Sequence, residues 1–232
     1  MSASTIPTRI RPSEQRLRRL AERRQRMLAE RGEVVDTLAP ERIAELRDRG
    51  VEDATDLGRL AARCEAAARA ASGRRVDQAR AAVARASDGG SIEEAEAAVK
   101  NLERDSVRRW TDRTECELAL VEVAERTAVE LTPGSTRWES DGRLVATTQI
   151  SADESLPVVV ASGGATGEVA LLWQTSRSTI RGDGTQEGEC DSQHAAVARI
   201  AAEFGEGMAL EEPAPATAAE TKPPEATRRA TP

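Results

Sequence analysis

The chain's only histidine lies four residues after a cysteine, and this Cys190/His194 pair is its one spacing suggestive of catalysis. Asp191 is a suitable N-cap, so a helix is predicted to begin there, with Cys190 at its N-terminus. Backbone N–H groups at that position favour a thiolate, and His194 would follow one turn along. The pair is a candidate cysteine nucleophile with a histidine base, or half a metal site. The structural alternative, a small residue at a strand-to-helix junction beside an exposed histidine, is preferred. We therefore assign no catalytic residue, no metal and no cofactor.

The remaining sequence offers little for catalysis. Cys64 and Cys116 are distant from each other and from Cys190, with no CxxC spacing, so reduced thiols are expected rather than a disulfide framework. The Gly-rich run 163–167 lacks a following Lys-Ser/Thr and opens no helix, so it is not a phosphate-binding P-loop. These features favour a non-enzymatic protein.

Positive charge gathers at the N-terminus of a chain whose net charge is −7. An arginine-rich helix there could meet phosphates. Glu14, Glu22 and Glu30 interleave with the arginines, which favours a solvated face or an acidic protein partner. We take as candidate interaction residues six of these arginines and the three tryptophans: Arg16, Arg18, Arg19, Arg23, Arg24, Arg26, Trp110, Trp138 and Trp173.

The elements that would position these residues begin with a flexible segment, residues 1–11. Residues 12–50 are predicted to form an arginine-rich helix from Pro12-Ser13-Glu14, broken at Pro40, and then a short helix over 41–49. Apolar residues at alternating three- and four-residue steps predict a heptad seam in the first helix, with Arg24 and Arg31 at two further seam positions. The apolar seam residues are Leu17, Leu20, Met27, Val34 and Leu38.

Residues 51–131 are predicted to form a long antiparallel helical hairpin resembling a coiled coil. Its helices would cover 53–87, weakened at Ser72-Gly73, and 91–131, joined by the turn Asp88-Gly89-Gly90. Ser91 followed three residues later by Glu94 has the spacing of a capping box. At about 1.5 Å per residue, the second helix would be a rod of roughly 60 Å.

The periodicity changes at Pro133, and residues 133–208 are predicted to form a small antiparallel β-sheet with one C-terminal helix. Strands are expected over 136–139, 144–150, 157–161, 168–175 and 178–181, and a helix from Asp191 to Phe204. The class is therefore α+β. Residues 209–232 alternate Pro with Ala, Thr and Glu, which predicts a disordered tail.

One segment, 183–205, carries a family resemblance. Its Asp183-Gly184, Gly188-Glu189-Cys190 and Phe204-Gly205 resemble a small bacterial domain of unknown function. Such domains are found beside AAA+-type ATPases in conflict-type gene clusters. The resemblance implies an accessory role and supplies no catalytic residue.

The predicted function is a non-enzymatic coiled-coil adaptor or structural subunit of a bacterial assembly, with a protein partner. A bacterial source is suggested by the heavy use of Arg over Lys and the abundance of Ala. Self-association through residues 13–38 is plausible. With no apolar signal segment and no long apolar run, we expect a cytoplasmic protein without membrane contact. Two alternatives stay open: nucleic-acid binding through the arginine-rich helix, and a thiol-dependent activity at Cys190 and His194.

Overall fold

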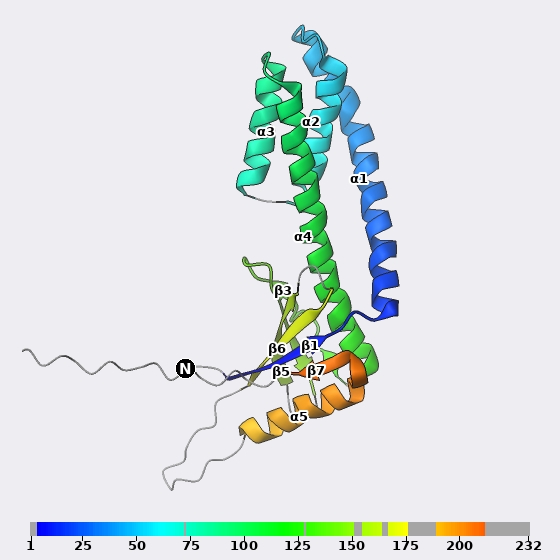
Figure 1. The fold of residues 1–232 in the computed structure, drawn as a ribbon, viewed down its shortest axis with the longest axis vertical. Coiled ribbons are helices and arrows are strands. Elements are labelled where there is room, and N and C mark those ends of the chain that lie inside the picture. Colours follow the sequence, from blue (N-terminus) through cyan, green and yellow to red (C-terminus); the bar gives the residue numbers. More distant parts are fainter. Residues whose placement is uncertain are drawn as a thin grey trace, which may run out of the picture.

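The computed structural model describes residues 4–71, 73–127, 129–150, 155–163, 167–175 and 189–211. An antiparallel sheet forms one end of the molecule, and helices extend from it as a stalk (Figure 1). Two helices, α1 (Glu14–Asp48) and α4 (Ile92–Arg126), run the length of the stalk. Two shorter helices, α2 (Ala54–Ala68) and α3 (Arg74–Ser87), complete a bundle at the far end. The α+β class predicted from the sequence is confirmed.

Helix α1 is one continuous helix, so the predicted break at Pro40 is wrong. It begins as expected, because the Ser13 hydroxyl accepts the Arg16 backbone N–H at 3.1 Å. Pro40 lies inside it and is exposed. A proline inside a helix costs about 3 kcal/mol, and packing outweighs that cost here. Ala39 and Leu46 are buried on either side of Pro40, and α2 packs along this part of α1.

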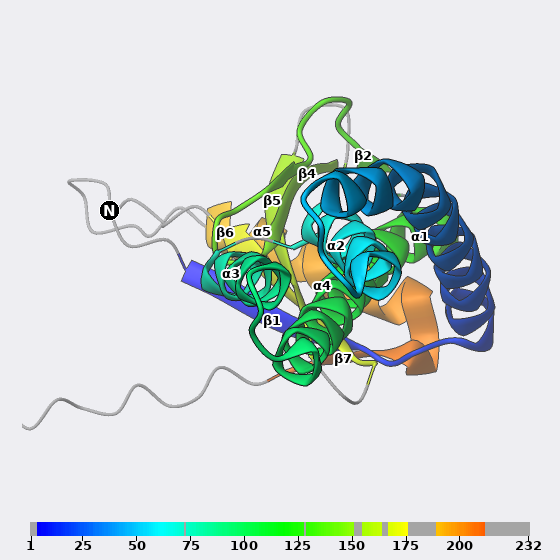
Figure 2. The same cartoon turned by 90° about the horizontal axis from the view of Figure 1, so that it is seen from above.

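The predicted single helix over 53–87 is also wrong, because the chain reverses between Ala68 and Arg74. Gly73 has φ +83°, a backbone conformation that glycine adopts without strain. The reversal is visible in an ion pair of 2.7 Å between Glu65 and Arg80. In a continuous helix these residues would be about 22 Å apart. The predicted two-helix hairpin is therefore only partly present: α3 and α4 pack against each other across the 88–90 turn, but α2 is a separate helix that contacts α1, α3 and α4 (Figure 2).

Helix α4 begins where the capping box predicts, with the Ser91 hydroxyl accepting the Glu94 N–H at 3.1 Å. The turn before it is also as predicted, since the Gly90 N–H donates to the Arg85 carbonyl at 2.9 Å. The helix ends at Arg126, earlier than predicted. Val129 is buried in the sheet core, and the short strand β2 (Glu130–Leu131) follows.

The sheet is entirely antiparallel, with strand order β2-β4-β5-β6-β1-β7 and β3 paired with β4. Four predicted strands are found: β3 (Arg137–Trp138), β4 (Leu144–Gln149), β5 (Ser155–Ser162) and β6 (Val169–Thr175). The predicted turn between β3 and β4 is closed by a hydrogen bond from Glu139 N–H to the Arg143 carbonyl at 2.8 Å.

The predicted flexible N-terminal segment instead contains a strand, β1 (Ser4–Ile10), inserted between β6 and β7. Its side chains are alternately buried and exposed, as expected for a strand with one face against the core. Ile6, Thr8 and Ile10 are buried, whereas Thr5 and Arg9 are exposed. The pairing with β6 is long-range in sequence, which is why a local pattern did not reveal it.

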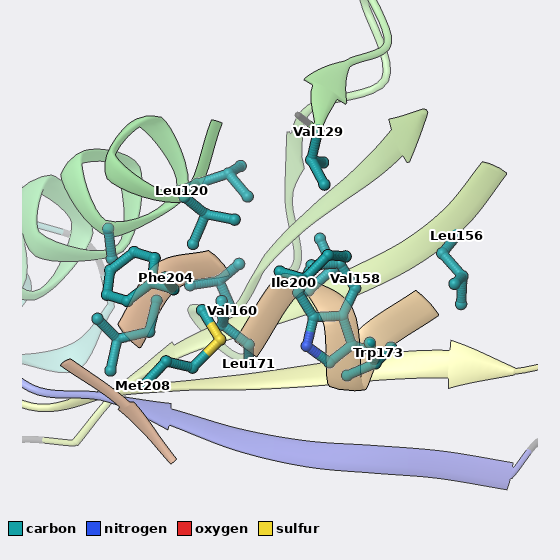
Figure 3. Packing of buried hydrophobic residues seen from close by; sticks show 14 of the residues in the cluster. Leu120, Val129, Leu156, Val158, Val160, Leu171, Trp173, Ile200, Phe204 and Met208 are labelled. Atoms are coloured by element: carbon teal, nitrogen blue, oxygen red, sulfur yellow. The ribbon is translucent and has the colours of Figure 1, made fainter. Parts of the chain in front are cut away.

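Helices α4 and α5 (Glu189–Phe204) cover the same face of the sheet. In Figure 3, Leu120 of α4 and Ile200 and Phe204 of α5 lie over residues of β5 and β6 such as Val160 and Leu171. A second apolar cluster fills the bundle and includes Val99 and Leu102 of α4. Between Leu102 and Cys116, no α4 residue belongs to either cluster. We call this part of α4, residues 103–115, the waist.

After α5, a short 3-10 helix, η1 (Gly205–Gly207), leads into strand β7 (Met208–Leu210). Residues 209 and 210 were assigned to the disordered tail, but they pair with β1. The rest of the predicted tail, 212–232, and the predicted strand 178–181 lie outside the described residues. No helix in the described ranges has the length and apolarity needed to cross a membrane.

Candidate interaction surfaces

Arg16, the first predicted contact residue, is buried at the base of the stalk. Its guanidinium forms an ion pair of 3.2 Å with Glu122 of α4, and the two side chains are 2% and 7% exposed. It also donates to the Gly167 carbonyl at 3.0 Å. Desolvation lowers the pKa of Arg16, and the carboxylates of Glu122 and Glu115 oppose that effect. Arg16 is therefore an internal anchor of α1 and is not available to a partner.

The same carboxylate links α4 to α5. Arg126 lies 3.4 Å from Glu122 in a second ion pair. Its guanidinium donates to the Phe204 carbonyl and stacks on the Phe204 ring, 3.9 Å from the centroid. A chain of charged groups thus connects α1, α4 and the end of α5. This arrangement holds α1 against the sheet end of the molecule.

The other predicted arginines of α1 do not form one basic face. Arg18 pairs with Glu14 at 2.6 Å, Arg19 with Glu125 at 2.9 Å and Arg23 with Glu117 at 3.6 Å. Arg24 and Arg26 are exposed, and neither takes part in an ion pair among the described residues. Most of the positive charge on this helix is therefore already matched by glutamates of α1 and α4.

The predicted heptad seam is only partly correct. Met27 is half-buried and borders a cavity of about 300 Å³ between α1 and α4 that Trp110 also lines. Arg31, expected in the seam, donates to the hydroxyl of the buried Ser106 at the waist. Leu17, also expected in the seam, is instead 47% exposed.

Leu17 belongs to an outward-facing row that we call the α1 stripe. Leu28, three helical turns further on, is 44% exposed. Ala21 and Arg24 are exposed between them, and the half-buried Val35 continues the same face. The large exposed hydrophobic side chains of the described residues are Leu17, Leu28 and Leu210. Two of these three therefore fall on one row of one helix.

The three tryptophans have different environments. Trp110 is half-buried in the α1–α4 cavity. Trp138 is half-buried, with the Arg113 guanidinium 5.1 Å from its ring centroid. Trp173 is completely buried, and its indole N–H donates to the Thr8 hydroxyl at 3.0 Å. Trp173 is thus a core residue, and the prediction that it contacts a partner is wrong.

The side chain of Cys190, the candidate nucleophile, lies outside the described part of the structure. His194 is exposed on α5. Cys64 and Cys116 are buried, and burial raises their thiol pKa values to about 11 and about 12. Both are therefore protonated thiols at neutral pH, which makes them poor nucleophiles. Among the described residues, no group of three or more His, Cys, Asp or Glu could hold a metal ion.

The sequence reasoning missed a basic groove beside the waist. Three adjoining cavities of about 500, 490 and 430 Å³ run between α3, α4 and the β3–β4 hairpin. Arg75 and Leu102 line both the first and the second, and Arg109 and Asp112 both the second and the third. Seven exposed arginines line this waist groove: Arg74, Arg75, Arg104, Arg108, Arg109, Arg113 and Arg143.

Among the described residues, the carboxylates in this lining are those of three aspartates. Asp105 pairs with Arg75, Asp141 with Arg143 at 2.6 Å, and Asp112 lies 4.0 Å from Arg108. The signal was present in the sequence, because Arg104 and Arg108, and also Arg109 and Arg113, have the four-residue spacing that brings side chains together on a helix.

No protein-family model matches the chain, and no curated protein or solved structure is detectably similar to it.

Proposed function

We propose that this chain is a non-enzymatic adaptor or structural subunit of a bacterial protein assembly, and that it binds its partner through the α1 stripe. The supporting observation is the exposure of Leu17 and Leu28 on one face of a long, anchored helix. Large apolar side chains gathered on one exposed face are characteristic of interaction sites. The buried Arg16–Glu122 pair keeps α1 in place without using that face.

The partner that best fits the stripe is an amphipathic helix with an acidic residue among its apolar ones. Helices recognise each other through apolar anchors repeated at three- and four-residue spacing. Arg24 lies between Leu17 and Leu28 on the stripe, exposed and outside the ion pairs of the described residues. A carboxylate opposite Arg24 would supply the missing charge. The resemblance of segment 183–205 would put such an assembly beside an AAA+-type ATPase.

Nucleic-acid binding through α1, the first alternative, has weaker support. Arg16 is buried, and Arg18, Arg19 and Arg23 are each paired with a glutamate. A phosphate would have to displace those carboxylates. The thiol alternative gains nothing from Cys64 and Cys116, whose pKa values are raised by burial.

The proposal is tested by affinity capture with the tagged full chain from a lysate of its source organism, with and without nuclease. The test variant is Leu17→Glu/Leu28→Glu. The matched control is Gln15→Glu/Ala29→Glu, which places the same charges at exposed α1 positions outside the stripe. We expect a stoichiometric protein that survives nuclease, is lost with the test variant and is retained by the control.

Equal capture by both variants would refute the stripe as the binding site. Partners that all disappear with nuclease would refute the adaptor function. Light scattering of the purified chain measures its oligomeric state and tests whether the chain binds a second copy of itself. A dimer that dissociates only in Leu17→Glu/Leu28→Glu would show that a second copy of this chain occupies the stripe instead of a different protein.

A further inference from the structure

The waist groove contains three arginines, Arg74, Arg104 and Arg113, that take part in no ion pair among the described residues. Its lining contains seven arginines and three aspartates, in a chain whose net charge is −7. The charge of the lining is therefore positive, opposite in sign to that of the whole molecule. Like charges at such density repel one another, and a folded surface that retains them is suited to a polyanion.

The geometry of the arginines fits a linear ligand. Arg104 and Arg108, and likewise Arg109 and Arg113, are each about one helical turn apart on α4, and this staggered row of four extends over about 13 Å of helix axis. Arg74 at the start of α3 and Arg143 on the β3–β4 hairpin flank this row from the two neighbouring elements. At about 3.4 Å per phosphate along one strand, the α4 row alone extends over roughly four phosphates.

The Arg113 guanidinium is oriented by its contact with Trp138, 5.1 Å from the ring centroid. This cation–π contact limits the conformations of the side chain without neutralising its charge. Arg113 is exposed and lines the hairpin end of the groove. Its charge is thus held at a defined position on the surface.

The rest of the lining distinguishes between classes of polyanion. The uncharged residues are small or polar: Ala71, Gly73, Gln78, Ala79, Ala98, Asn101, Ser140, Gly142, Ala161 and Ser162, with Leu102 as the one large apolar residue. Leu102 is only 1% exposed. The groove therefore offers no apolar pocket for the anchors of an acidic helix. A polar, arginine-rich surface is typical of contacts with a sugar–phosphate backbone.

We propose that the waist groove binds the phosphodiester backbone of a nucleic acid without reading its sequence. The site is separate from the α1 stripe and shares no residue with it. It also differs from the nucleic-acid site first considered on α1. The contacts are guanidinium-to-phosphate pairs, so affinity should depend strongly on salt concentration.

The test is fluorescence anisotropy with the full chain and labelled mixed-sequence oligonucleotides of about 20 nucleotides, as single-stranded DNA, single-stranded RNA and duplex DNA. These three arms identify which nucleic acid supplies the backbone. The groove variant is Arg104→Gln/Arg108→Gln. The matched control, Arg18→Gln/Arg26→Gln, removes two exposed arginine charges from α1 outside the stripe. Circular dichroism checks that both variants keep their helices.

We expect binding at about 50 mM salt that weakens as salt rises, with log Kd against log salt reporting about three phosphate contacts. The groove variant, which lacks two arginines, should bind about tenfold more weakly and lose about 1.5 to 2 units of that slope, and the α1 control should match wild type. Absence of binding at low salt, or equal losses in the two variants, would overturn the proposal. Stronger binding of polyglutamate than of every oligonucleotide would assign the groove to an acidic protein instead.

Discussion

Removing Glu122 should destabilise the protein strongly, because it would leave the buried Arg16 without its ion-pair partner. The Arg16 side chain is 2% exposed, and its polar contacts in the described structure are Glu122 and the Gly167 carbonyl. Breaking a buried ion pair by deleting one partner typically costs about 3–5 kcal/mol. We therefore expect Glu122→Ala to lower the free energy of unfolding by about that amount. For a chain of this size the corresponding fall in Tm is about 6–20 °C.

The reverse deletion should cost less. In Arg16→Met, Glu122 keeps Arg126 as a partner at 3.4 Å, so the expected loss is about 1–3 kcal/mol. The double variant Arg16→Met/Glu122→Leu removes both charges and should be more stable than Glu122→Ala alone. The assay is urea unfolding followed by circular dichroism and tryptophan fluorescence.

The matched control is the exposed pair of Arg18 and Glu14, whose side chains are 73% and 81% exposed. Arg18→Ala should cost under about 0.5 kcal/mol, because water screens the pair. If Glu122→Ala proves no worse than Arg18→Ala, the pair does not anchor α1. The position of α1 on the sheet would then depend on its packing with α2 and α4.

Two further perturbations test packing and electrostatics. At Gly58 an added Cβ would lie 2.7 Å from the Ile43 backbone nitrogen, so Gly58→Ala should destabilise by about 1–3 kcal/mol in urea unfolding. Gly32, also helical, has nothing within 4 Å, so Gly32→Ala should instead stabilise by up to about 1 kcal/mol, and equal effects would contradict the close approach of α1 and α2. Burial raises the pKa of Glu115, and the nearby Asp112 adds to that effect, while the Ser162 hydroxyl and Arg16 oppose it. At pH values between the unfolded and folded pKa of Glu115, the native state therefore binds more protons than the unfolded state. In that range the stability of the protein falls as pH rises. Glu115→Gln should therefore gain stability over wild type as pH increases above about 4.5, measured by unfolding at several pH values, and a constant difference would refute this.

Signals confined to a few neighbouring residues were read correctly from the sequence. The caps at Ser13 and Ser91 each depend on a hydrogen bond to a residue three positions on. The β3–β4 turn, with Gly142 at φ +86°, likewise depends on local backbone conformation. Such interactions are complete within one turn of chain, so residue type and spacing suffice to predict them.

The predictions that were wrong concern residues whose interaction partner is distant in the sequence. Ser72-Gly73 was expected to kink a helix, but Glu65 and Arg80 meet across the reversal there. Strand β1 was missed because its partner β6 lies more than 150 residues away in sequence. Arg16 was assigned to the surface because its partner, Glu122, is 106 residues away. Nothing in the N-terminal sequence distinguishes Arg16 from Arg18, although one is buried and the other exposed.

The waist of α4 explains why the basic groove lies between the two apolar cores. Above it, α4 packs into the bundle through residues up to Leu102, and below it α4 packs on the sheet from Cys116 onward. The two cores require different faces of one helix, so the apolar stripe must change phase between them, near the buried Ser106 that Arg31 contacts. Residues in this interval are released from both cores. Arginines at 104, 108, 109 and 113 can therefore occupy the waist without an apolar packing cost. A stalk with two separate cores thus leaves a segment whose sequence is free to serve binding, and we expect charge substitutions there to alter ligand affinity far more than stability.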